Sequence, residues 1–193
     1  MLFTTHEFFV FFLIVLVSYW LLAKQKVAQN VLLLGSSYFF YGFVNPIFCL
    51  LLLASTLIDF ICGAALGARK GSRNAWVIIS IATNLSILGV FKYFNFFVAN
   101  IYEMLNLIGL EISSPRFLEI VVPVGISFYT FQSMSYTIDV YRGVQKPVFR
   151  FPDFALYVAF FPQLVAGPIE RARTLIPQIT ERRIISFEQV ASG

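Results

Sequence analysis

Charged side chains are scarce in this chain. Only 12% of its 193 residues are Asp, Glu, Lys or Arg, whereas 59% are hydrophobic and the mean hydropathy is +0.80. Soluble domains carry about 25% charged and roughly 45–50% apolar residues, so this chain has too little polar surface to cover a water-soluble globule. The scarcity of charge predicts an all-α protein, a polytopic transmembrane helical bundle in which residues 1–193 form a single membrane domain.

Residues that commonly serve as general bases or metal ligands are almost absent. His6 is the single histidine, and the two cysteines, Cys49 and Cys62, both lie within an apolar run without metal-ligand spacing. We therefore expect no metal site, and the residues alone reveal no catalytic constellation. The net charge of +4 comes with no groove-reading motif, which argues against a nucleic acid as partner.

The apolar residues fall into five runs that predict membrane-embedded helices, followed by a sixth run that is interrupted. The five cover about residues 7–23, 31–43, 47–66, 75–101 and 120–141. The sixth, at about 154–169, contains Pro162, Gly167 and Pro168, and it is shorter than the about 20 residues of a straight crossing. It predicts a re-entrant or broken helix near the C-terminal end, covered by protein or by a water-filled cavity.

Basic residues follow the first, third and fifth runs. Because these loops fall on one side of a polytopic chain, the positive-inside rule places that side in the cytoplasm and the N-terminus outside. The residues are Lys24, Lys26, Arg69, Lys70, Arg73, Arg142, Lys146 and Arg150.

A polar stripe runs along the fifth segment. At about 100° per residue, Gln132, Ser135 and Asp139 fall on one helical face. Arg142 lies at the edge of that face, where it can pair with Asp139. Lipid exposure of this stripe would be costly, so we expect it to face the bundle interior or an aqueous cavity. Two interpretations remain open, namely contacts between helices and the lining of a polar path for a substrate.

Two further ionisable residues lie inside apolar runs. Asp59 is about 12 residues into the third run, roughly 18 Å along a helix. A carboxylate at that depth indicates either a functional site or a structural partner for a hydroxyl or amide on a neighbouring helix. Lys92 lies near the outer end of the fourth run, where its ammonium can reach the interface.

Five motifs, taken in order, resemble the membrane-bound O-acyltransferase family in its alginate O-acetyltransferase branch. They extend through essentially the whole chain: SSYFFYGFVNP at 36–46, STLIDFICG at 55–63, FKYFNFF at 91–97, PVGISFYTFQSMSYTIDVYRG at 123–143 and FFPQLVAGPIERA at 160–172.

The resemblance implies a multi-pass enzyme of a bacterial inner membrane with a funnel and a central tunnel. An acyl donor, such as acetyl-CoA or another activated acyl carrier, is engaged from the cytoplasmic side, and no cofactor stays bound. The acceptor is a hydroxyl of an exported or cell-surface polysaccharide such as alginate, or an acyl-relay protein in the periplasm or outside. The implied funnel or substrate-path residues are Gln132, Ser135, Asp139, Arg142, Gln163, Gly167 and Arg171.

One departure from the family is serious. The histidine credited with catalysis in this family lies well beyond the last motif, and neither His6 nor any other residue of this chain matches it. We therefore expect no catalytic residue in this chain, which resembles the N-terminal portion of a longer enzyme and would be inactive alone. The alternatives are a non-catalytic scaffold or partner subunit of a polysaccharide-modifying complex and, with no internal repeat to support it, a transporter.

Overall fold

A computed structural model describes residues 4–43, 45–109, 122–164, 167 and 170–181. Within these ranges the regular secondary structure is helical, without strands, which confirms the predicted all-α class. The elements are α1 (His6–Leu21), α2 (Lys26–Gly42), α3 (Pro46–Gly67), α4 (Arg73–Leu88), the π-helix η1 (Gly89–Tyr93), α5 (Phe94–Leu107), α6 (Ile126–Tyr141), α7 (Phe151–Ala159), α8 (Phe161–Leu164) and α9 (Ala172–Thr180).

Local sequence signals set several helix starts. The side chain of Thr5 accepts a hydrogen bond from the backbone N–H of Phe8 and caps α1. Asn45 caps α3 in the same way, and Pro46 follows it at the first helical position, where a missing N–H is tolerated. Gly125 precedes α6 with a φ of 78°, a left-handed conformation that favours glycine.

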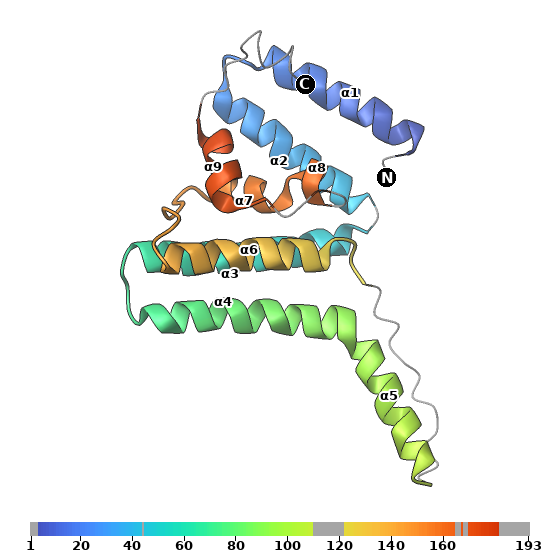
Figure 1. Ribbon diagram of the computed structural model, residues 1–193. Coiled ribbons are helices and arrows are strands. Elements are labelled where there is room, and N and C mark those ends of the chain that lie inside the picture. Colours follow the sequence, from blue (N-terminus) through green and yellow to red (C-terminus); the bar gives the residue numbers. More distant parts are fainter. Residues whose placement is uncertain (1–3, 44, 110–121, 165–166, 168–169, 182–193) are drawn as a thin grey trace.

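Among the described residues, two helices are long and apolar enough to cross a membrane. They are α3, with 22 residues, and the continuous helix over Arg73–Leu107, with 35 residues. The second was predicted as one crossing over about 75–101, but the structure bends it at η1, so that α5 leaves the line of α4 (Figure 1). A π-helical turn disturbs the hydrogen-bond ladder and is a recognised cause of such bends.

Three long helices pack together in one group. Each of α3, α4 and α6 packs against the other two, and Figure 1 shows α6 in front of α3 with α4 alongside. The contact between α3 and α6 is close, because a Cβ added at Gly63 would lie only 2.5 Å from Cε1 of Tyr136. A side chain at position 63 would therefore press against the Tyr136 ring, which explains the glycine at this contact.

The short helix α7 is the most enclosed element. All seven of its residues from Asp153 to Ala159 are buried, and it packs against α2, α3, α6 and α9. Its nine residues span roughly 14 Å, which is too short to cross a bilayer. Helix α7 ends at its C-cap residue Phe160, which has an extended ψ of 105°, and α8 follows directly. The helix is thus interrupted at Phe160 within the predicted broken segment, while residues 165–166 and 168–169 of that segment lie outside the described part.

Candidate functional site

Asp59 on α3 is the centre of a buried polar cluster that joins three helices. Its side chain is fully buried, and its carboxylate accepts hydrogen bonds from Ser80 and Asn84 on α4 and from Thr137 on α6. The Asn84 amide donates to both carboxylate oxygens, over 3.0 and 2.8 Å. The amide oxygen of Asn84 in turn accepts from Ser55 over 3.1 Å.

This geometry agrees with the interpretation of Asp59 as a structural partner for groups on neighbouring helices. Hydroxyl and amide groups of neighbouring helices satisfy its carboxylate, as a structural partner requires. Within the described ranges, the ion pair that the structure records lies elsewhere, between Arg150 and Asp153. A functional role for Asp59 stays a prediction.

Gln132 on α6 is bound to α7. Its side-chain amide donates to the backbone oxygen of Tyr157 over 2.7 Å, and the Tyr157 hydroxyl donates to the backbone oxygen of Gln132 over 3.2 Å. Ser135 donates to the same Gln132 oxygen over 2.8 Å. The Gln132 side chain is fully buried, yet its Oε1 has no hydrogen-bond partner among the described residues. A buried acceptor of this kind costs about 1–3 kcal/mol and is a natural point of contact for a ligand or a water.

A second unpaired acceptor lies within α8. Gln163 has a buried Oε1 without a partner in the described part of the chain. The backbone N–H of Gly167 donates to the backbone oxygen of Gln163 over 3.0 Å, and a Cβ at Gly167 would lie 2.7 Å from the Gln163 Cα. The turn therefore brings Gln163 and Gly167 together.

Asp139 and Arg142, whose spacing would allow an ion pair, do not form one in the described part of the structure. The two side chains form no ion pair within the described chain, and the exposed Arg142 is the C-cap residue of α6, where the chain turns into the next loop. Asp139 contributes instead through its backbone oxygen, which accepts from the N–H groups of Val144 and Gln145. Arg171 is also exposed and precedes the first turn of α9.

The candidate residues are spread along α6 instead of forming one cluster. Gly125, at the start of α6, abuts the end of α8, because a Cβ there would lie 2.6 Å from the backbone oxygen of Leu164. Gln163 therefore belongs to the starting end of α6, whereas Asp139 and Arg142 belong to its other end. The 16 residues of α6 place these ends roughly 24 Å apart at the helical rise of about 1.5 Å per residue.

Sequence reasoning missed a second buried carboxylate. Asp153 at the start of α7 is 4% exposed and accepts from the Asn30 amide over 3.0 Å. The same Asn30 nitrogen donates to the backbone oxygen of Ile179, so α2, α7 and α9 meet at one point. Arg150 lies 3.7 Å from Asp153, and this three-residue spacing is the signal in the sequence that could have indicated the site.

A groove of about 350 Å³ opens beside Asp153. It is lined by residues 145–150 and by the end of α9, including Ile176, Pro177 and Thr180. Lys26 donates from the start of α2 to the backbone oxygen of Thr180 next to it.

The three basic loops gather at this end of the bundle. Arg73 donates to the backbone oxygen of Tyr141 over 2.6 Å, which ties the start of α4 to the end of α6. The end of α3 lies against the loop after α6, since a Cβ at Gly67 would overlap Pro147. Figure 1 shows the end of α3, the start of α4 and the end of α6 on the same side.

Comparison with known proteins identifies the relatives of this chain. A probable alginate O-acetylase of Pseudomonas aeruginosa is 38% identical over 186 residues, which cover 94% of this chain and 35% of the relative. The corresponding protein of Azotobacter vinelandii is 37% identical over 185 residues, covering 94% of this chain and 36% of the relative. The chain is homologous to part of the alginate O-acetylases.

A peptidoglycan O-acetyltransferase of Helicobacter pylori is also similar, with 31% identity over 201 residues that cover 89% of this chain and 37% of the relative. No family model matches the chain, and no solved structure matches it. The resemblance to the alginate O-acetyltransferase branch is confirmed. The chain spans 35–37% of the length of these relatives.

Proposed function

We propose that this chain forms part of a membrane O-acyltransferase that transfers an acetyl group to hydroxyls of an exported or cell-surface polysaccharide. The observation that carries the proposal is the similarity, over 94% of the chain, to alginate O-acetylases. The peptidoglycan O-acetyltransferase differs from them in its named acceptor and shares the named transfer chemistry. Transfer of an acetyl group to a hydroxyl, which both kinds of relative share by name, is therefore better supported than either named acceptor.

The proposed reaction joins a hydroxyl to an activated acetyl group. With acetyl-CoA as donor, the acceptor oxygen attacks the thioester carbon, the carbon–sulfur bond breaks, and coenzyme A leaves as the thiolate. A general base takes the hydroxyl proton. We assign that base to a histidine outside this chain, since His6 does not match the family position.

We assign to this chain the walls of the path by which donor and acceptor meet. The unpaired buried acceptors Gln132 Oε1 and Gln163 Oε1 support this role, because each lacks a partner among the described residues. Ser135, Asp139, Arg142, Gly167 and Arg171 complete the candidate set. Since Asp139 and Gln163 belong to opposite ends of α6, the path follows this helix instead of forming a single funnel mouth.

The proposed location is a bacterial inner membrane, crossed several times, with the N-terminus outside. The clustering of the basic loops at one end of the bundle supports this orientation, because basic loops stay in the cytoplasm. The donor then arrives at the basic end, and the polysaccharide or a relay protein receives the acetyl group at the other.

Reconstitution of the full-length protein tests the proposal. Proteoliposomes that carry radiolabelled acetyl-CoA on the basic side and alginate or peptidoglycan on the other should place label on one of the polysaccharides. Gln132→Met should lower the rate about tenfold or more, because it removes the amide and keeps the length of the side chain. Asn100→Ala on the exposed α5 serves as the matched control and should not change the rate.

Two results would contradict the proposal. Transfer that appears only after a separate transferase is added would indicate a scaffold. Donor that crosses the membrane with its acetyl group intact would indicate a transporter.

A further inference from the structure

The helix that contains α4, η1 and α5 is much longer than a bilayer crossing requires. Its 35 residues would span roughly 52 Å if straight, against a hydrocarbon core of about 30 Å. The distance from Arg73, at the basic end, to Lys92 in η1 is 19 helical steps, or roughly 29 Å. If α4 crosses the bilayer, η1 therefore lies at the opposite boundary, and that is where the helix bends.

The residues at the bend are those that anchor helices in the interface. The Lys92 ammonium lies 5.5 Å from the centre of the Tyr93 ring and donates to the Ser127 hydroxyl over 3.1 Å. Lysine and tyrosine are typical of the headgroup region, where a cationic tip and an amphipathic ring both find polar partners.

Beyond the bend, α5 has two unlike faces. At about 100° per residue, one side carries its apolar residues, and the opposite side carries its amides and its one acid, with Phe96 and Leu107 as exceptions. The apolar side consists of Phe94, Phe97, Val98, Ile101, Tyr102, Met104 and Leu105, and the polar side includes Asn95, Asn100, Glu103 and Asn106.

The apolar face of α5 is not covered by the described part of the bundle. No residue of α5 is buried, and Phe97 and Ile101 are 58% and 51% exposed. Large apolar residues are also exposed before the bend, namely Ile78 and Leu85 on α4 and Val90 in η1. Exposed apolar side chains therefore occur on both sides of the bend, as expected where both helices contact lipid.

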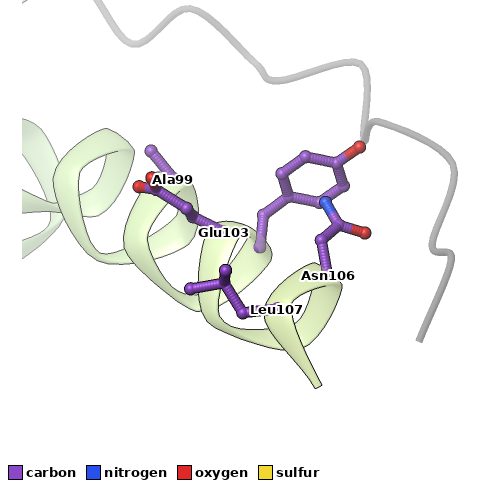
Figure 2. A pocket seen from close by; sticks show the side chains of 5 residues that line it. Ala99, Glu103, Asn106 and Leu107 are labelled. Carbon is purple, nitrogen blue, oxygen red and sulfur yellow. The ribbon is translucent and has the colours of Figure 1, made fainter. Parts of the chain in front are cut away.

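The polar side of α5 carries a shallow hollow of about 490 Å³, lined by residues of α5 itself. Figure 2 shows Ala99, Glu103, Asn106 and Leu107 projecting from this helix. A single helix does not enclose a ligand, so we assign no binding site to it.

We propose that α5 is an interfacial helix that lies in the outer headgroup region of the bilayer, with its apolar face toward the acyl chains and its polar face toward water. The partner is the lipid surface, and the bend at η1 turns the helix from the crossing direction into that plane. Helices of this kind bury their apolar face about 5–10 Å into the boundary. The proposal requires that α4 crosses the membrane with its Arg73 end in the cytoplasm, and it does not depend on acetyl transfer.

Spin labelling of the full-length protein in liposomes tests the placement. Single cysteines would replace Asn95, Glu103 and Asn106 on the polar face and Val98, Ile101 and Leu105 on the apolar face. Collisions with oxygen report lipid, and collisions with a water-soluble nickel chelate report water. The unsubstituted protein gives the background from Cys49 and Cys62, and Leu57→Cys on the exposed side of α3 gives the mid-bilayer reference.

We expect accessibility that alternates with the helical period. Polar-face labels should collide several-fold more often with the nickel chelate, and apolar-face labels with oxygen, at a depth shallower than the label at position 57. Apolar-face labels shielded from both reagents would show that protein covers the face. Uniform nickel access, or a mid-bilayer depth for α5, would equally overturn the proposal. Loss of acetyl transfer with this pattern intact would contradict the proposed function alone.

Discussion

At the scale of single residues, Asp59 shows how an apolar chain tolerates a buried carboxylate. No described cation pairs with it, and donors on α4 and α6 supply its hydrogen bonds instead. An apolar replacement would leave those donors without an acceptor, which costs more than the loss of one bond. The cluster therefore fixes how the three helices meet.

Asn84→Ala should destabilise the protein, because Asn84 donates to both oxygens of Asp59 and accepts from Ser55. We expect a loss of about 1–3 kcal/mol, measured by thermal unfolding of the detergent-solubilised full-length protein. Asn100→Ala, whose amide bonds only to its own helix at Phe96 in the described part, should stay within about 0.5 kcal/mol. The double variant Asp59→Ala/Asn84→Ala should lose less than the two single losses combined, and strict additivity would contradict the cluster.

Gly63→Ala tests the close contact between α3 and α6. The added methyl group would press against the Tyr136 ring, whose hydroxyl accepts a hydrogen bond from the N–H of Val148. We expect a loss of about 1–3 kcal/mol, as for other overpacked cores, and a lower yield of folded protein by size-exclusion chromatography. The control is Gly35→Ala, where no other atom lies within 4 Å, and an unchanged or higher stability is expected. Equal behaviour of the two variants would count against the contact.

At the scale of the elements, the enclosure of α7 depends on polar contacts at its start. Neither its length nor its composition distinguishes a buried nine-residue helix from a broken crossing. Asn30 and Asp153 decide the matter, because they join the start of α7 to α2 and, through Ile179, to α9. The short helix is thereby held inside the protein and away from lipid.

Asn30→Ala should loosen α9 before the rest of the bundle unfolds. The substitution leaves the 4%-exposed Asp153 with Arg150 as its recorded partner and removes the bond to the Ile179 oxygen. Limited proteolysis of the full-length protein should cut near residues 170–181 several-fold faster than in the wild type. Asn106→Ala on α5 is the matched exposed control. An unchanged cleavage pattern in Asn30→Ala would show that α9 is held by its apolar face alone.

At the scale of the whole molecule, the basic residues that follow the first, third and fifth apolar runs lie at one end of the bundle. The starts of α2 and α4 and the ends of α3 and α6 carry or adjoin basic residues. The structure links the start of α4 and the end of α3 to the end of α6 and its following loop, through Arg73 and Gly67. Because basic loops stay in the cytoplasm, a bundle with its basic loops at one end prefers the orientation in which that end faces the cytoplasm.

Impermeant maleimide labelling of intact cells measures that orientation. Lys70→Cys and Lys146→Cys should remain unlabelled until the cells are permeabilised, because both positions lie at the basic end. Asn106→Cys should react from outside, since η1 and α5 lie at the other end. Labelling of both Lys70→Cys and Lys146→Cys in intact cells would show that the orientation is opposite to the proposed one. Labelling of only one of them would show that the two loops lie on different sides of the membrane.

The sequence by itself determined the class of the protein and the approximate extents of its helices, since scarcity of charge and runs of apolar residues suffice for both. It also located the polar stripe, the break in the sixth run and the branch of relatives. Only the tertiary structure showed that Gln132 faces α7, that Asp139 and Arg142 do not pair, and that Asp59 is satisfied by α4 and α6. The bend at η1 and the role of Asn30 were likewise invisible in the sequence. The physical reason is that apolar runs act through their own residues, whereas a buried polar group depends on partners that are distant along the chain.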